Sequence, residues 1–317
     1  MGINSEHPCA FTSSEADALP ALQELGVRPR VEYAEANTVL LPVLRRTEEA
    51  DYLYLYHYMY EEKESFETVV SVSGSYEPYL LDTWSGQVSE VLNYAVKDGR
   101  TEITVNITPG ETQLLVLRRK DAPEEGYERR TAILETAIPL SGWSLSVDSF
   151  EPGEKLVRTE NNPETGVETT EVAYTTNHVV LDAGELKALF PWKYLPAVGK
   201  EVSGIGSYSI SFTLSADDLA DASRVLFRAE SFGGGTASAV CNGQAVPVNM
   251  DSRTADLTGV VQPGENTLTV RVTSSLRNRM ITVGYDQGWN ILKPEAAAYG
   301  MTGETELIVV RCYSGNE

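Results

Sequence analysis

The chain contains few of the residues from which nucleophilic active sites are built. Its 317 residues include three histidines, His7, His57 and His178, and no Gly-x-Ser-x-Gly turn. A serine or cysteine nucleophile needs a base within hydrogen-bonding reach, so the sequence indicates no such catalytic centre. His57 falls inside a predicted strand and His178 begins another. We expect both to be packed or hydrogen-bonded rather than catalytic.

Cysteine is equally scarce, and its spacing indicates no metal site. Cys9, Cys241 and Cys312 are odd in number and far apart, which predicts free thiols rather than a disulfide framework or a zinc site. Calcium needs no sequence motif, and the loops at Asp182 and Asp251 could supply ligands or be ordinary turns. We therefore predict no cofactor. Whether a structural calcium ion is bound is not decided by the sequence.

Positive charge and long apolar runs are also lacking. The chain has 25 Lys and Arg against 46 Asp and Glu, a net charge of -21. Nucleic acids and anionic lipids attract clustered basic residues, so neither is an expected partner. No apolar run is long enough to span a membrane. The N-terminus, MGINSEHPCAF, has no signal-peptide pattern. If the chain is complete as given, we expect a cytoplasmic protein; its location is otherwise left open.

Phosphate and glycosidic chemistry have no clear signature either. The glycine run 233–235 lies between two predicted strands with no following helix and no Lys-Ser/Thr pair, which indicates a loop. A glycosidase needs two carboxylates about 5 to 10 Å apart across a sugar. Among the 46 acidic residues no pair stands out. We nominate no catalytic residue.

What the sequence does contain is a strong β pattern. One helix is predicted over 13–25, where leucines recur at helical spacing before Gly26. Short β-rich runs separated by turn residues follow, which predicts an all-β protein. The predicted strands are 51–61, 66–73, 88–96, 101–107, 112–118, 143–149, 154–159, 167–174, 178–182, 207–214, 224–230, 237–242, 266–273 and 305–312, with a short helix at 184–189.

These strands suggest two β-sandwich domains. The segment 120–130, KDAPEEGYERR, is charged and contains Pro and Gly, which is typical of a linker. We predict an N-terminal helical segment over 1–37 and a small β-sandwich over 38–122. The larger number of strands and the irregular connections over 130–317 suit a jelly roll.

The strand over 51–61 has the clearest alternation. Five tyrosines alternate with Leu53, Leu55, His57 and Met59. A period of two places all five tyrosines on one face of a strand. We interpret this face as one that packs against a neighbouring domain, and the candidate interface residues are Tyr54, Tyr56 and Tyr58.

Several segments together resemble a known family. The quoted segments are ALQELGVRPRVEY, EPYLLDTWSGQV, PGETQLLVLRR, LSGWSLSV, PWKYLPAVGKEVSGIGSYSISFTL, VCNG, PGENTLTVRVTSSLRNRM and AYGMTGETELIVV. In this order they resemble the C-terminal part of family 106 glycoside hydrolases, the α-L-rhamnosidase type. More loosely, the second domain resembles the galactose-binding-like jelly rolls of family 2 enzymes. The resemblance implies that the catalytic carboxylates lie on a preceding barrel, so no catalytic residue is carried over.

Sugar contact, if present, has four candidate residues. Asn278 and Arg279 offer amide and guanidinium donors after a strand, and Trp289 and Trp192 offer surfaces on which a sugar could stack. The alternative is structural: Asn278 and Arg279 would tie down a loop, and the tryptophans would plug the ends of a core.

Four functional hypotheses follow. The first is a non-catalytic, carbohydrate-binding or structural C-terminal portion of a rhamnosidase-type hydrolase. Its partners would be a rhamnose-containing or plant glycan and a catalytic barrel domain or subunit. The others are a free-standing carbohydrate-binding protein, a structural subunit of a split hydrolase, and a complete hydrolase.

Overall fold

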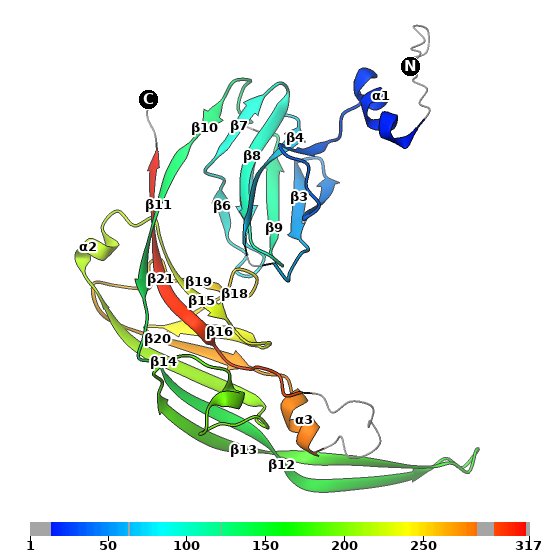
Figure 1. The fold of residues 1–317 in the computed structure, drawn as a ribbon, viewed down its shortest axis with the longest axis vertical. Helices are drawn as coiled ribbons and strands as arrows, with labels where there is room; N and C mark the ends of the chain where they lie inside the picture. The colour runs from blue at the N-terminus through cyan, green and yellow to red at the C-terminus, as the bar shows by residue number, and fades with distance from the viewer. Residues whose placement is uncertain (1–13, 63, 121, 284–294, 315–317) are drawn as a thin grey trace. The chain divides into compact units, whose positions relative to one another are not determined.

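The computed structural model describes residues 14–62, 64–120, 122–283 and 295–314. They form antiparallel strands in four sheets, accompanied by short helices (Figure 1). The predicted all-β sandwich class is confirmed. Contacts within the chain divide it into two compact units, one ending at Thr131 and the other spanning Ala132–Ser314.

The predicted N-terminal helix is present. A 3-10 turn, η1 (Glu15–Asp17), leads into α1 (Ala18–Glu24). Gly26 follows with a φ of 71°, a left-handed conformation that glycine adopts without strain, and its N–H donates to the carbonyl of Gln23 at 2.9 Å. The helix therefore ends where the sequence predicted.

Two five-stranded sheets form the first unit. One has the order β1-β4-β8-β7-β10 and the other β2-β3-β9-β5-β6. Both contribute to a single buried cluster that includes Leu53, Leu55, Val70, Ile103 and Leu117. The strands are β1 (Val31–Tyr33), β2 (Leu40–Arg46), β3 (Ala50–His57), β4 (Phe66–Ser73), β5 (Glu77–Leu81), β6 (Val88–Glu90), β7 (Tyr94–Lys97), β8 (Arg100–Ile107), β9 (Thr112–Arg118) and β10 (Glu128–Arg129).

The segment that composition marks as a linker is hydrogen-bonded along the first unit. β10 pairs antiparallel with β7, and the backbone N–H groups of Gly126 and Val96 donate to Val96 and Tyr127. The ring of Tyr127 lies 5.5 Å from that of Tyr94. A polar, turn-rich composition is shared by linkers and by edge segments, so composition alone does not separate the two.

The second unit also has two sheets, β13-β12-β14-β20-β16-β17 and β11-β21-β15-β19-β18. Its core cluster includes Trp143, Trp192, Tyr208, Phe227 and Leu307. The elements are β11 (Thr131–Pro139), β12 (Ser144–Asn161), β13 (Glu168–Glu185), η2 (Trp192–Tyr194), β14 (Gly204–Leu214), α2 (Ala216–Leu219), β15 (Arg224–Ser231), β16 (Thr236–Cys241), β17 (Gln244–Val246), β18 (Val248–Asn249), β19 (Thr254–Asp256), β20 (Gly264–Thr273), α3 (Arg277–Val283) and β21 (Thr302–Ser314).

A long two-stranded ribbon extends from this unit (Figure 1). β12 and β13 pair from Ser144 and Glu185 out to Asn161 and Glu168, where the sequence predicted four short strands. The gap predicted between 149 and 154 contains a register shift between Pro152 and Lys155, and the strand continues beyond it. The helix predicted at 184–189 is wrong, because Gly184 and Glu185 still pair with β12 and residues 186–189 form no helix.

Candidate functional site

The tyrosine strand β3 has one buried face and one outward face. Leu53, Leu55 and His57 are fully buried, whereas Tyr52 and Tyr54 are 36% and 38% exposed. Tyr56 is half-buried on the same outward face. The alternation read from the sequence thus corresponds to the two faces of the strand. Tyr58 is also half-buried but lies beyond the end of β3.

The outward face continues across every strand of its sheet. Antiparallel register places Val43 of β2 beside Tyr54, Leu114 of β9 beside Tyr54, Leu81 of β5 beside Leu114, and Val88 of β6 beside Leu81. Directly paired residues project to the same side of a sheet. These five side chains therefore form one apolar row that crosses the sheet.

Neighbouring rows extend this surface. One row contains Tyr52, Val116 and Tyr79, and another pairs Leu41 with Tyr56. We call the ten residues together the apolar sheet face: Leu41, Val43, Tyr52, Tyr54, Tyr56, Tyr79, Leu81, Val88, Leu114 and Val116. Sequence reasoning found three of them, Tyr52, Tyr54 and Tyr56, because period-two alternation is visible in β3 alone.

Charged groups border the apolar sheet face. Arg45 pairs with Tyr52 at one edge and Glu90 with Tyr79 at the other. The guanidinium of Arg118 lies 5.4 Å from the centre of the Tyr79 ring, within the range of a cation–π contact. A hydrogen bond with Glu77 raises the pKa of the Tyr79 hydroxyl. The surface therefore has an apolar centre and a polar border.

A buried carboxylate anchors the start of β3 beneath this surface. Asp51 is fully buried and accepts hydrogen bonds from the Tyr76 hydroxyl at 2.7 Å, from Arg46 at 3.3 Å and from Arg119. Burial by itself would raise the pKa of Asp51, but these donors and positive charges outweigh it and hold the pKa below 3.8. The ionised carboxylate joins β3 to β2 and to the end of β9.

Two of the sugar-contact candidates have structural roles in the second unit. Trp192 is 1% exposed, and its Nε1 donates to the Tyr208 hydroxyl at 2.8 Å. Burial raises the pKa of Tyr208 to about 12, so this hydroxyl stays protonated. Asn278 is 3% exposed, and its amide exchanges hydrogen bonds with the backbone of Ala297 at 3.0 and 2.7 Å. Trp192 offers no ring face to a sugar, contrary to its predicted stacking role, and Asn278 ties down a loop.

Arg279 is more accessible than these two residues. Its Nη2 forms an ion pair with Glu151 and donates to Ser149 at 3.3 Å, and its side chain is 14% exposed. Its Nε is buried and has no hydrogen-bond partner among the described residues. The fourth candidate, Trp289, lies outside the described residues.

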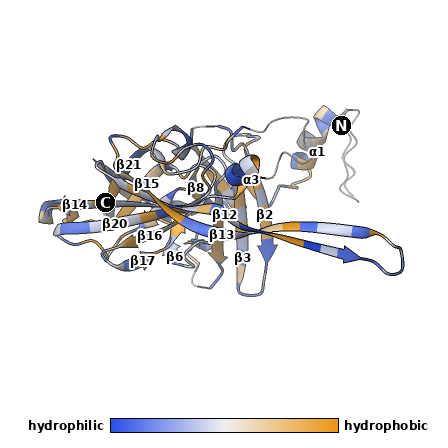
Figure 2. Ribbon diagram, turned by 90° about the horizontal axis from the view of Figure 1, so that it is seen from below, coloured by the Kyte–Doolittle hydropathy of each residue, from blue (hydrophilic) through white to orange (hydrophobic). Residues whose placement is uncertain are grey.

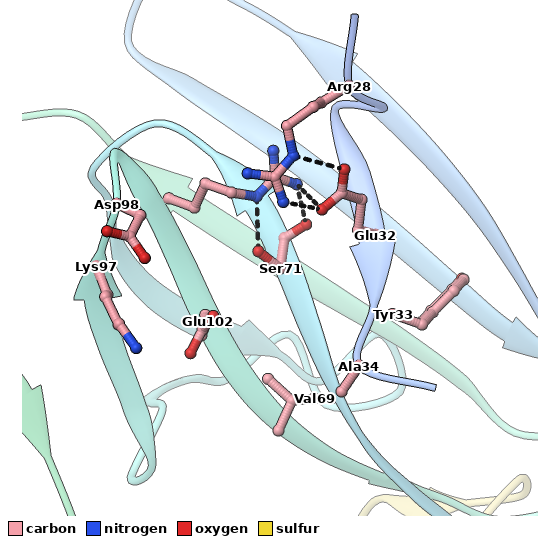
Figure 3. A pocket seen from close by; sticks show the side chains of 10 residues that line it. Arg28, Glu32, Tyr33, Ala34, Val69, Ser71, Lys97, Asp98 and Glu102 are labelled. Carbon is pink, nitrogen blue, oxygen red and sulfur yellow. Dashed lines mark hydrogen bonds and ion pairs between the residues drawn. The ribbon is translucent and has the colours of Figure 1, made fainter. Parts of the chain in front are cut away.

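A small polar pocket of about 160 Å³ lies in the first unit (Figure 3). Arg28 bonds to Glu32 at 2.7 Å, and Arg100 bonds to the hydroxyl and carbonyl of Ser71 at 2.7 and 2.8 Å. Arg100 also donates to the carbonyls of Pro29 and Arg30. The guanidiniums are thus engaged by the protein itself, and they hold the segment before β1 against β4.

The described part of the chain shows neither a metal-ligand cluster nor a membrane-spanning helix. No group of three or more His, Cys, Asp or Glu side chains in it could hold a metal ion. No helix in it is long and apolar enough to cross a membrane.

Comparison with known proteins gives one informative likeness. No protein-family model and no curated protein matches the chain. Among solved structures, the rhamnosidase from Novosphingobium sp. PP1Y superposes with a TM-score of 0.65 at 20% identity, covering 93% of this chain and 26% of that one. The FMN-binding β-glucuronidase from Facaelibacterium prausnitzii L2-6 matches with a TM-score of 0.31 at 17% identity, covering 56% and 23% of the two chains. This chain therefore has a rhamnosidase-related fold and spans about a quarter of that rhamnosidase.

Proposed function

We propose that this chain is a non-catalytic, all-β accessory portion of a rhamnosidase-type glycoside hydrolase. The observation that carries the proposal is the extent of the likeness: 93% of this chain shares its fold with 26% of a rhamnosidase. In the finer proposal, the chain is the C-terminal part of a family 106 enzyme, and its second unit is a galactose-binding-like jelly roll. It would support the catalytic portion and help to shape the sugar site.

Three carboxylates are held in contacts that do not suit a catalytic acid or base. Asp51 is buried beneath a sheet, Glu151 is paired with Arg279, and Asp148 bonds to the His178 ring at 3.0 Å. A glycosidase acid or base needs a carboxyl group free to reach the glycosidic oxygen or a water molecule. These three carboxylates are engaged in contacts within the fold.

Hydrolysis of 4-nitrophenyl α-L-rhamnoside tests this proposal. We expect no turnover by the purified chain, because its role is to accompany the catalytic carboxylates. The native polypeptide or complex that contains the chain, isolated from its source through a tag, should hydrolyse the same substrate. Turnover by the purified chain that is lost on substitution of one carboxylate would contradict the accessory role, and an inactive native form would contradict the link to rhamnosidases.

Arg279 is the candidate for direct sugar contact that is left among the residues the structure describes. Its guanidinium is partly exposed and carries N–H donors beyond those that bond to Glu151 and Ser149, which leaves donor capacity for a sugar hydroxyl. We expect L-rhamnose to bind the purified chain with a Kd of about 1 mM, and Arg279→Ala to weaken binding about tenfold. Arg277→Ala is the control, since Arg277 is exposed on the same helix, α3. Calorimetry showing equal binding by both variants would remove Arg279 from the site.

A further inference from the structure

The apolar sheet face has the composition of an interface centre. Leu41, Val43 and Val88 are 50%, 40% and 60% exposed, beside Tyr52 and Tyr54. None of its ten residues is charged, although the chain carries 46 acidic residues. Charge depletion and aromatic enrichment, surrounded by polar groups, distinguish the buried centres of protein interfaces from ordinary surface.

The chemistry of this face favours a protein over a glycan as its occupant. Sugars bind where aromatic rings lie beside groups that hydrogen-bond to hydroxyls. Here the tyrosines alternate with Val43, Leu114, Val116 and Leu81, which cannot hydrogen-bond to a sugar. Branched aliphatic side chains instead suit a dry contact with another apolar protein surface.

The size of the face favours a contact between domains over a dimer of two copies. Five strands about 4.8 Å apart, and residues about 3.3 Å apart along β3, give a footprint on the order of 400 Å². Stable complexes of separate proteins bury about 800 Å² on each partner. Contacts between domains of one chain cover smaller areas, from roughly 300 Å² a side, because the covalent link keeps the partners together. A net charge of -21 also opposes self-association.

We propose that the apolar sheet face packs against the catalytic portion of the hydrolase to which this chain belongs. The inference rests on the proposed function and names the surface by which this chain would support the catalytic portion. The remaining three-quarters of a rhamnosidase such as the matched one provides an occupant of sufficient size. Its contacting surface is apolar at the centre, with an acidic group facing the exposed Arg45 at the border.

Hydroxyl-radical footprinting of the purified chain and of its native form measures coverage of this surface. We expect oxidation of the peptide containing Tyr52, Tyr54 and Tyr56 to fall about tenfold in the native form. Sedimentation should show the purified chain as a monomer at 100 μM. Equal oxidation in the two forms would overturn the inference. A dimer that Tyr54→Lys dissociates would also overturn it, since the occupant would then be a second copy.

A variant tests whether the face holds the catalytic portion. With the substitution made in the native form itself, Tyr54→Lys should raise the oxidation of Tyr52 and Tyr56 about tenfold, to the level of the purified chain, because it removes one hot spot of the contact. Tyr194→Lys is the matched control, at a tyrosine 67% exposed in the second unit. Circular dichroism should show both variants folded. Equal oxidation of Tyr52 and Tyr56 in the two variants would contradict the inference.

The same measurements separate this inference from the proposed function. Rhamnoside hydrolysis by the native form without protection of the tyrosines contradicts the inference alone. Protection of the tyrosines in a native form that does not hydrolyse the rhamnoside contradicts both the proposed function and the catalytic portion as the occupant. Loss of binding to a polysaccharide on Tyr54→Lys would assign the face to a glycan and overturn the inference.

Discussion

The apolar sheet face and the outer half of the β12–β13 ribbon both expose β-branched and aromatic side chains, but they differ in what lies behind them. Tyr54 projects from a strand whose other side, at Leu53 and Leu55, is fully buried. Val157 and Tyr174 are 59% and 43% exposed, and the residues beside them on both strands are exposed as well. A packed opposite side makes an exposed apolar surface rigid, whereas the ribbon has water on both sides.

The ribbon is held together by cross-strand pairing. Val157 lies opposite Val172, and Arg158 opposite Glu171. Figure 2 shows hydrophobic and hydrophilic residues mixed along its length. A two-stranded ribbon without a core is only marginally stable in water. We therefore expect the ribbon to open locally while β3 stays folded.

The two regions should differ most in the free energy of unfolding that a leucine-to-alanine substitution costs in each. Leu55→Ala removes a fully buried side chain beneath the apolar sheet face and should lower the free energy of unfolding by about 3 kcal/mol. Leu156→Ala, at a ribbon residue 47% exposed, should lower it by less than about 0.5 kcal/mol. Urea-induced unfolding measures both values. Similar losses would show that the ribbon is as well packed as β3.

Asp51→Asn tests how strongly the sheet is anchored beneath its tyrosines. Loss of the charge from a buried, hydrogen-bonded carboxylate should cost about 2 kcal/mol at pH 7. Because the folded-state pKa of Asp51 is depressed, its contribution is present above the unfolded value and lost as the pH falls below 3.8. Urea unfolding from pH 7 to pH 3 should show the wild type and the variant converging. A constant difference would mean that the ionisation of Asp51 is unimportant.

His57→Leu should have a smaller effect of opposite sign. His57 is fully buried, and both ring nitrogens lack a hydrogen-bond partner within the described structure. Replacing an unsatisfied polar ring by an apolar side chain should raise the free energy of unfolding by about 1 kcal/mol. The control is His178→Leu at the base of the ribbon, 58% exposed and bonded to Asp148. Destabilisation by His57→Leu in thermal unfolding would indicate a polar partner for the ring.

Arg158→Ala should have the smallest effect. Its guanidinium lies 2.5 Å from Glu160, and the two side chains are 74% and 61% exposed. Ion pairs this exposed contribute less than about 0.5 kcal/mol. We expect an unchanged melting temperature and fast amide exchange over Val157–Glu160 with or without the substitution. Slow exchange there, lost in Arg158→Ala, would show a ribbon stabilised by its charges.

Part of the fold and of the candidate site was predictable from local patterns. Alternation in β3, the leucines before Gly26 and the turn residues between strands each act over a few residues, so a single sequence shows them. The continuation of β12 across the register shift between Pro152 and Lys155 was not visible, because it depends on pairing with β13. The pairing of Glu128 and Arg129 with β7 was not visible for the same reason, since that strand is distant in the sequence.

The sequence by itself determined the all-β class, the two-sided character of β3 and the scarcity of catalytic groups, since composition and period-two alternation are local properties. Only the tertiary structure decided that Trp192 is buried, that Asn278 ties down a loop, and that Val43, Leu114, Leu81 and Val88 join Tyr54 in one row. Those facts depend on which distant strands pair and in what register, and that choice is made by burying the whole core at once.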